Sequence, residues 1–203
     1  MKITKIVITG GPCAGKSDAK VWVRRTFTQE GRVVLFIPET ATELIAGGVA
    51  PWTCGSRLEY HLFQHMLQVE KERVFELAAQ TMDVEEALIV CDRGALDCKA
   101  YLDQADFEKM LEMLGETEEG LCARYDAVFH LVTAAKGAVE FYTVANNEAR
   151  TETVAEAIAL DDRLKAAWSG HPHLCVIDNA TDFEKKMVRL TAAISSFLEG
   201  QSA

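Results

Sequence analysis

A glycine-rich segment near the start of the chain, Gly10-Gly11-Pro12-Cys13-Ala14-Gly15-Lys16-Ser17, constrains the fold more than any other feature. It follows a short apolar run at residues 6–9 and precedes a helical pattern of apolar residues over 19–29. The spacing is that of the P-loop pattern G-x-x-x-x-G-K-[ST], whose glycines let the backbone curl and aim its N–H groups at an anion. The segment therefore predicts a strand, a phosphate-binding loop and a helix, in that order.

The residue types of this loop are those that hold a nucleoside triphosphate, either ATP or GTP. We predict that every residue of the loop contacts the nucleotide: Gly10, Gly11, Pro12, Cys13, Ala14, Gly15, Lys16 and Ser17. Lys16 is expected to act on the β- and γ-phosphates, and the Ser17 hydroxyl to bind Mg²⁺. The alternative is a glycine turn that happens to contain a lysine.

Short apolar runs alternate with helical patterns along the rest of the chain. The runs cover 3–9, 33–37, 88–91, 127–132 and 174–177; the helical patterns cover 16–29, 57–81, a pair within 103–124, 152–168 and 182–198. This alternation is typical of an α/β protein whose parallel sheet is covered by helices on both faces. With 203 residues, 49% of them hydrophobic, the chain is expected to form a single domain over 1–203.

Charge and cysteine content narrow the class of protein. The net charge of −10 argues against nucleic-acid binding, because the tight basic groups, Arg24-Arg25 and Lys185-Lys186 with Arg189, are expected to be solvated helix faces. The six cysteines form no C-x-x-C pair, which predicts reduced thiols. We find no signal-peptide pattern and no apolar run long enough for a transmembrane segment, so a cytoplasmic protein is expected.

Asp92 and Arg93 follow the apolar run 88–91, where a buried strand is predicted to end beside the phosphate loop. Asp92 is the expected second magnesium ligand, directly or through water. ATPases that hydrolyse rapidly commonly carry a water-activating carboxylate directly after this aspartate, and here that position is Arg93. The pair therefore favours phosphoryl transfer to a bound acceptor over hydrolysis. Arg93 is predicted to neutralise phosphate charge, with a purely structural salt bridge as the alternative.

Glu39 ends the second predicted strand and is the candidate general base for the acceptor hydroxyl. Glu43 lies four residues further on and is the alternative base, because both would share a helical face. A simple acidic residue at a helix N-terminus would also account for Glu39.

Two loops late in the sequence complete the candidate site. The segment 146–151 is expected to belong to a lid at about 136–155, from which Arg150 would close over the phosphates; a merely solvated arginine is the alternative. Asn179 follows the last predicted strand, where a loop would pass the nucleotide base, although no base preference can be drawn from it.

Six segments carry a family resemblance: GGPCAGKS at 10–17, IPETATELI at 37–45, CDRGALD at 91–97, ARYDAV at 123–128, NNEAR at 146–150 and WSGHPH at 168–173. Together they resemble the P-loop AAA-type ATPase domain shared by NadR-like kinases and TRPL translocation defect proteins. The resemblance implies a three-layer P-loop NTPase fold, with five parallel strands in the order 2-3-1-4-5, helices on both faces and a small lid. More distantly, the chain resembles deoxynucleoside kinases, with counterparts in Glu39, Asp92-Arg93 and Phe63-Gln64.

The resemblance leaves two functions open. NadR-like relatives phosphorylate a nicotinamide riboside, which implies Mg²⁺-dependent transfer of a γ-phosphoryl group to a small hydroxyl-bearing acceptor such as a nucleoside. The translocation defect proteins bind GTP and phosphoinositides, so the alternative is a regulatory module that recognises a protein or a phosphoinositide headgroup with little turnover. Asp18 stands where relatives carry a second Thr or Ser near the α-phosphate, and it would weaken nucleotide binding unless it turns outward.

Overall fold

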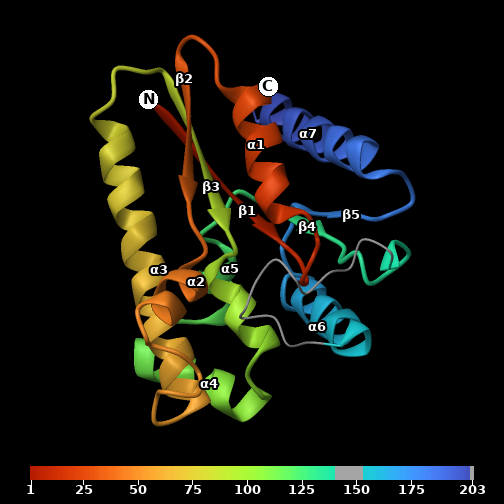
Figure 1. Cartoon of the computed structure of the whole chain (residues 1–203). Helices are drawn as coiled ribbons and strands as arrows, with labels where there is room; N and C mark the ends of the chain where they lie inside the picture. Colours follow the sequence, from red (N-terminus) through yellow and green to blue (C-terminus); the bar gives the residue numbers. More distant parts are fainter. Residues whose placement is uncertain (140–152, 202–203) are drawn as a thin grey trace.

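Five parallel strands form one sheet in the order β2-β3-β1-β4-β5 (Figure 1). The computed structural model describes residues 1–139 and 153–201. The strands are β1 Lys2–Thr9, β2 Arg32–Ile37, β3 Glu86–Asp92, β4 Ala127–Leu131 and β5 Leu174–Ile177. The predicted parallel sheet and its strand order are confirmed.

Helices cover both faces of the sheet (Figure 1). The first layer consists of α1 Lys16–Phe27 and α7 Phe183–Gly200. The opposite face is covered by α3 Arg57–Gln80, α4 Gln104–Leu114, α5 Glu118–Cys122, the short 3₁₀ helix η1 Ala95–Ala100 and the end of α6 Val154–Ala167. The short helix α2 Thr40–Ala46 follows β2 and packs against α3.

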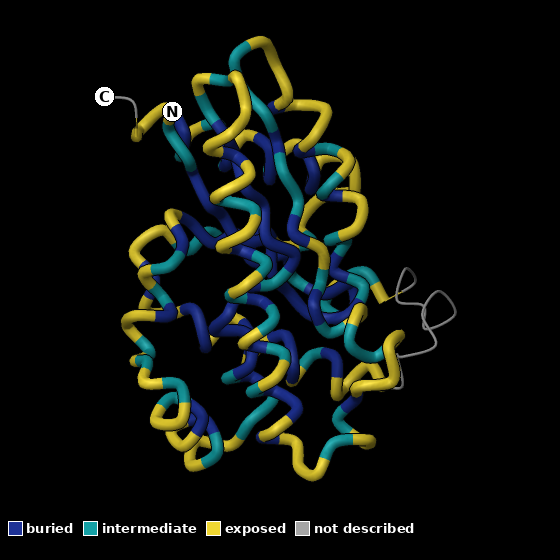
Figure 2. The backbone as a smooth tube through the Cα atoms, turned by 90° about the vertical axis from the view of Figure 1, so that its left-hand side faces the viewer, coloured by how far each residue is buried: buried dark blue, intermediate teal, exposed yellow. Residues whose placement is uncertain are grey.

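The central strands β1 and β3 are largely apolar because helices cover both of their faces. In β1, Ile6 and Ile8 pack toward α1 and α7, whereas Val7 packs toward the opposite layer. In β3, Val90 and Cys91 divide in the same way. All of these side chains are buried, and the strands accordingly form the dark interior of Figure 2. The period-2 alternation of a half-exposed sheet is therefore missing from the sequence.

The sequence patterns did not predict α2 and η1. Both are shorter than the window over which helical periodicity becomes visible. The helix predicted for 16–29 ends at Phe27, and the one predicted for 57–81 ends at Gln80. These two short helices matter for function because they follow β2 and β3, at the edge of the sheet where the phosphate loop lies.

Two expectations from composition can be compared with the structure. None of the six cysteines forms a disulfide bond. Within residues 1–139 and 153–201, no helix has both the length and the apolar character that crossing a bilayer requires.

Candidate functional site

The loop between β1 and α1 has the backbone geometry of an anion cradle. Gly10, Cys13 and Gly15 have positive φ values of 141°, 54° and 92°, and left-handed residues of this kind turn successive N–H groups toward one side. Gly15 is the N-cap of α1 and has no side chain to satisfy the first-turn amides. Those amides, at the positive end of the helix dipole, are left for an anion.

The scaffold holds the loop carbonyls away from that cradle. Three successive carbonyls accept hydrogen bonds: Pro12 from Thr133 Oγ1, Cys13 from Ala134 N at 3.2 Å and Ala14 from Lys186 Nζ at 3.1 Å. Because a peptide N–H and its neighbouring C=O point in opposite directions, anchoring the carbonyls from behind turns the amides toward the open side. The cradle is therefore preorganised by the segment after β4 and by α7, which lie far from it in the sequence.

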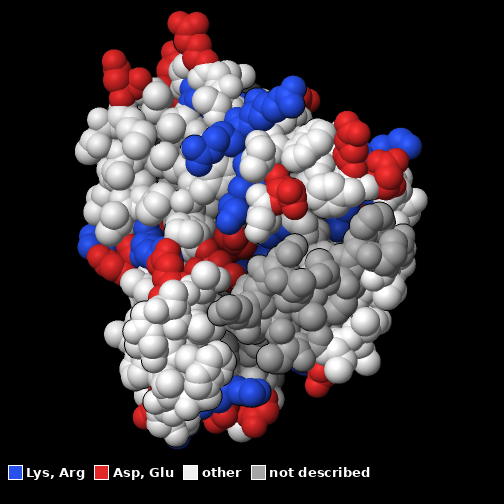
Figure 3. All heavy atoms as spheres, viewed as in Figure 1, with Lys and Arg blue, Asp and Glu red and all other residues white. Residues whose placement is uncertain are grey.

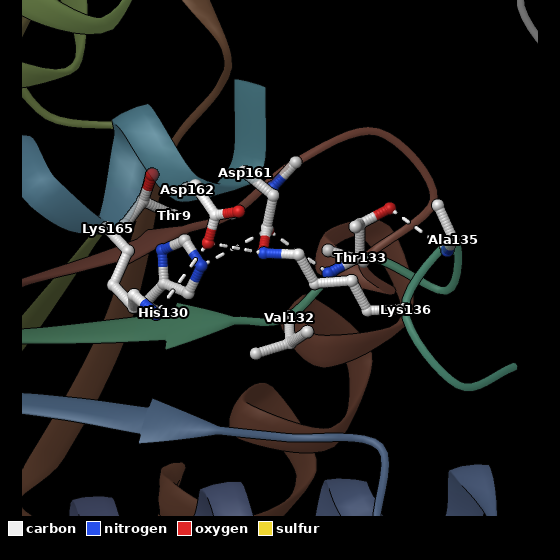
Figure 4. Close-up of polar contacts among 12 residues, drawn as sticks. Thr9, His130, Val132, Thr133, Ala135, Lys136, Asp161, Asp162 and Lys165 are labelled. Atoms are coloured by element: carbon white, nitrogen blue, oxygen red, sulfur yellow. Dashed lines mark hydrogen bonds and ion pairs between the residues drawn. The ribbon is translucent and has the colours of Figure 1, made fainter. Parts of the chain in front are cut away.

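Asp161 of α6 anchors the same loop through an amide (Figure 4). The carboxylate is buried and has four polar neighbours: Gly11 N at 2.9 Å, Thr133 N at 3.1 Å, His130 Nε2 at 3.1 Å and Lys136 Nζ at 3.0 Å. Burial alone would raise the pKa of Asp161, but these donors hold it well below its usual range. Sequence reasoning missed Asp161. The available signal was an aspartate within the apolar stripe of α6, next to Leu160 and Leu164.

Lys16, Ser17 and Asp18 lie where the loop enters α1. Lys16 Nζ donates to the carbonyls of Gly10 and Gly11, at 3.1 and 3.2 Å, so its charge lies over the cradle. Ser17 and Asp18 are exposed. Contact between Asp18 and a nucleotide stays a prediction.

Asp92 fits a magnesium ion, although it already has a cationic partner. It pairs with Ile8 in the sheet register and so lies at the end of β3 beside the loop. Its Oδ2 accepts from Lys20 Nζ at 2.9 Å, while its buried Oδ1 has no hydrogen-bond partner within the described residues. A carboxylate oxygen together with the Ser17 hydroxyl is the oxygen donor set that Mg²⁺ prefers. Lys20 was missed, although it lies one helical turn beyond Lys16.

In the parts of the chain that the structure describes, no three His, Cys, Asp or Glu side chains gather into a metal cage. A magnesium ion at Asp92 would therefore depend on phosphate oxygens and water for most of its ligands, as is usual for Mg²⁺ in phosphoryl-transfer sites.

Glu39 and Arg93 meet between the ends of β2 and β3. Arg93 Nε donates to Glu39 Oε1 at 2.5 Å, and Arg93 Nη1 lies 3.4 Å from the Gly10 carbonyl. Arg93 has a left-handed φ of 71°, an uncommon backbone conformation for a non-glycine residue. Burial alone would raise the pKa of Glu39, but the charges of Arg93 and Lys16 lower it to about 2. Glu39 is therefore ionised at neutral pH.

Glu43, the alternative base, does not reach this pair. Its carboxylate accepts from Lys71 Nζ at 2.9 Å, and Lys71 also donates to the Pro38 carbonyl. Of the two glutamates, only Glu39 lies beside the phosphate loop.

A small hollow adjoins the Glu39–Arg93 pair. It is lined by polar side chains of α2 and α3, including Thr40, Gln64, His65 and Gln68, and it has room for about one water molecule. Tyr60, His61 and Tyr101 form an aromatic group nearby, with ring centroids 5.1 and 5.5 Å apart. Burial and the charge of Glu39 raise the pKa of Tyr60 to about 12.

The helical Phe63-Gln64 pair singled out in the sequence divides between the two sides of α3. Gln64 lines the hollow, whereas Phe63 is exposed. Of the other residues of the hollow, His65, Gln68 and Cys98 were missed because no motif marks them.

Of the two remaining predicted residues, the structure describes Asn179 but not Arg150. Arg150 lies outside the described residues, as does most of the predicted lid at 136–155. Asn179 Nδ2 donates to the carbonyls of Thr133 and Lys136, both at 2.7 Å, and its Oδ1 accepts from Lys186. The whole amide is engaged with the scaffold, so contact between Asn179 and a nucleotide base stays a prediction.

Surface charge near α1 is positive despite the net charge of −10. Figure 3 shows basic side chains gathered in a band over α1, where Arg24 and Arg25 are exposed. The surface over α2 and the start of α3, at the lower left of the view, carries few charges. Both arginines belong to the last turn of α1, at the end of the helix away from the phosphate loop.

Comparisons with known proteins agree with this geometry. The sequence matches the family described as AAA domain over residues 5–186. Two solved structures of deoxyadenosine kinase from M. mycoides are similar in fold, each 14% identical in sequence and covering 95% of this chain. One, with bound dCTP, is covered over 100% of its length with a TM-score of 0.62; the other, with bound dATP, over 99% with a TM-score of 0.57. No curated protein matches the sequence. The chain therefore belongs to the AAA domain family of P-loop nucleotide-binding proteins and has a kinase-like fold.

Proposed function

We propose that this protein is a kinase that transfers the γ-phosphoryl group of ATP or GTP, with Mg²⁺, to a hydroxyl group of a small acceptor such as a nucleoside. One observation carries the proposal: the Glu39–Arg93 pair lies beside the phosphate loop, at the mouth of a polar hollow. An acceptor must be held in line with the γ-phosphate, and the polar side chains of the hollow lie where they could hold one.

In this proposal, separate residues bind the phosphates, stabilise developing charge and orient the acceptor. The loop amides and Lys16 bind the β- and γ-phosphates, and Arg93, close to the Gly10 carbonyl, stabilises charge that develops on the transferred group. Bound magnesium, held by Ser17 and Asp92, would supply further charge neutralisation. A carboxylate whose pKa is about 2 is a weak base, so we assign Glu39 the task of accepting a hydrogen bond from the acceptor hydroxyl and orienting it.

The hollow supports an acceptor with both aromatic and hydrogen-bonding parts. Along its wall Gln64 Oε1 has no hydrogen-bond partner within the described residues, whereas Thr40 donates to Gln68 and Gln68 donates to Glu72. Tyr60 and Tyr101 offer aromatic surface close by. This is the chemistry of a nucleoside, in agreement with the riboside that NadR-like kinases phosphorylate and with the name of the structurally similar deoxyadenosine kinase. Because the hollow has room for about one water, binding of an acceptor requires the hollow to widen.

That narrowness is also the observation that favours the alternative, a nucleotide-binding regulatory module that recognises a protein or a phosphoinositide headgroup with little turnover. Such a module would use the phosphate loop in the same way but would need no acceptor hollow. It predicts tight binding of ATP or GTP and no transfer to any small acceptor.

The two functions are separated by a transfer assay. Purified protein is incubated with Mg-ATP or Mg-GTP and a panel of nucleosides and ribosides, and phosphorylated products are detected by mass spectrometry. The kinase proposal expects transfer to at least one acceptor, lost in Glu39→Gln and kept in Glu43→Gln, which alters the same residue type four positions away. Triphosphate binding without transfer contradicts the proposal and favours the module, and phosphate release without an acceptor indicates simple hydrolysis.

A further inference from the structure

Lys186 is buried, although the sequence predicts that it lies on a solvated helix face. The basic group formed by Lys185, Lys186 and Arg189 is expected to be a solvated helix face, and Lys185 is indeed exposed. Lys186 is only 3% exposed and points from the first turns of α7 toward the underside of the phosphate loop. The expectation was wrong for this residue because adjacent positions on a helix lie about 100° apart and face different surroundings.

The ammonium group of Lys186 joins three parts of the chain that carry the site. Its three N–H donors have three acceptors: the Ala14 carbonyl of the phosphate loop at 3.1 Å, the Val132 carbonyl after β4 at 2.7 Å and Asn179 Oδ1 after β5 at 2.7 Å. A lysine has three donors and no acceptor, so its hydrogen-bonding capacity is fully used.

Among the described residues, the positive charge of Lys186 has no direct counter-ion. No carboxylate in residues 1–139 and 153–201 forms an ion pair with it. Asp161 forms an ion pair with Lys136, and Asp178 forms one with Arg189. A buried charge without a paired partner is costly, and such an arrangement persists where a further group compensates it. The open side of the loop, where Lys16 also lies, is the place where an anion would do so.

We propose that Lys186 is a positioning residue of the phosphate cradle: it holds the Ala14 carbonyl turned away from bound phosphate and contributes positive charge from behind the loop. This inference rests on the triphosphate binding of the proposed function. It assigns to α7 a part in nucleotide binding that neither the loop motif nor the strand-end residues include.

The proposal predicts opposite effects of pH on affinity and on stability. The groups that face Lys186 are Asp161 from α6, Asp178 after β5, Arg189 on its own helix and Lys16 in the loop. Burial, with help from Arg189 and Lys16, lowers the pKa of Lys186 to about 8, whereas an unfolded lysine stays near 10.5. Between these values the unfolded chain binds more protons, so this group makes the ligand-free fold more stable as pH rises.

Triphosphate affinity should change in the other direction. A bound anion favours the charged form and raises the pKa of Lys186, so by linkage the affinity falls as pH rises through 8. If binding raises the pKa by one unit, the affinity decreases about sixfold between pH 7.5 and 9.5. A lysine with only a structural role would change stability with pH and leave affinity unchanged.

The test is titration calorimetry with Mg-ATP and Mg-GTP at pH 7.5 and 9.5, accompanied by urea unfolding of the ligand-free protein. We expect the wild type and Lys185→Met to lose affinity about sixfold over this range. Lys186→Met should bind more weakly at pH 7.5 and show no such dependence. Lys186→Arg, which stays charged, should also have a flat profile.

The possible results distinguish the role of Lys186 from triphosphate binding itself. A flat affinity profile in the wild type overturns the role of Lys186 and leaves triphosphate binding intact, and this result needs no folded variant. The same holds if Lys186→Met is folded and retains the wild-type profile. No triphosphate binding by the wild type at either pH overturns the proposed function itself, and this inference with it.

Discussion

Replacing Asp161 by asparagine tests whether the buried carboxylate of α6 anchors the phosphate loop. The substitution preserves the size of the side chain and removes its charge. Asparagine can still accept through one oxygen, but its NH₂ group would face Lys136 Nζ, which now donates to Oδ2 at 3.0 Å. A donor would therefore oppose a donor in a buried position.

The size of the effect follows from the contacts that are lost or weakened. A hydrogen bond to a charged group contributes about 1.5–3 kcal/mol, and the bond from Lys136 is lost outright. The bonds from Gly11 N and Thr133 N become neutral ones, each weaker by about half. Allowing for relaxation, we expect the free energy of unfolding to fall by about 3 kcal/mol, at the lower end of values for breaking a buried charge pair.

Asp162→Asn is the matched control. Asp162 also pairs with Lys136, at 2.6 Å, but its side chain is 54% exposed, and exposed pairs contribute about 0–1 kcal/mol. Urea unfolding at pH 7 measures the stability of both variants, and titration calorimetry with Mg-ATP measures their affinity for triphosphate. We expect weaker triphosphate binding in Asp161→Asn alone. A loss of stability no greater than that of Asp162→Asn would refute the argument.

The pH dependence of stability provides a second check on Asp161. Because the pKa of the folded carboxyl is below that of the unfolded chain, its contribution is fully present above about pH 4 and is lost as pH falls toward the folded pKa. The wild type should therefore lose stability more steeply than Asp161→Asn on acidification. Parallel curves would contradict the placement of a charged Asp161.

Three further predictions concern the loop, the metal and the acceptor side. Gly15→Ala should lower the free energy of unfolding in urea by about 1–2 kcal/mol, because φ is 92° and the added Cβ would lie 2.7 Å from the Phe183 ring. Gly170→Ala, with open space around it, should be nearly neutral, and equal effects would contradict the strain at Gly15. Lys20→Met should increase the affinity for Mg²⁺ in the presence of nucleotide, since it frees Asp92 Oδ2, and unchanged affinity in calorimetry would count against Asp92 as a ligand. The transfer rate should show no loss from protonation of Glu39 between pH 7 and 5, because its pKa is about 2. A loss in that range, present also in Glu43→Gln, which is expected to keep transfer, would count against the ionised pair.

The α/β architecture and the phosphate loop could be predicted from sequence because both depend on local pattern. Runs such as 88–91 are continuous in apolar residues because both of their faces are covered, and this is visible without knowledge of the partners. The loop depends on residue types at fixed spacing, where glycine permits left-handed backbone and lysine supplies charge. Asp92 was found by the same logic, since the ends of parallel strands share one edge of the sheet.

The strand order came from family resemblance, because nothing local in a strand specifies its neighbours. The pairing of β1 with both β3 and β4 joins segments separated by the whole of α3 and by α4 with α5. For the general base, the sequence favoured Glu39 and left Glu43 as the alternative. The structure separates them, because Glu39 pairs with Arg93 and Glu43 pairs with Lys71.

Sequence by itself determined that this chain forms a parallel α/β sheet with a phosphate loop after its first strand, because those features follow from periodicity and from a motif of eight adjacent residues. Only the tertiary structure decided what holds that loop. Asp161 and Lys186 look like ordinary helix residues in the sequence, yet both are buried against the loop from more than a hundred positions away. The physical reason is that a charged side chain becomes part of a site through burial and hydrogen-bond partners, and these exist only once distant helices pack together.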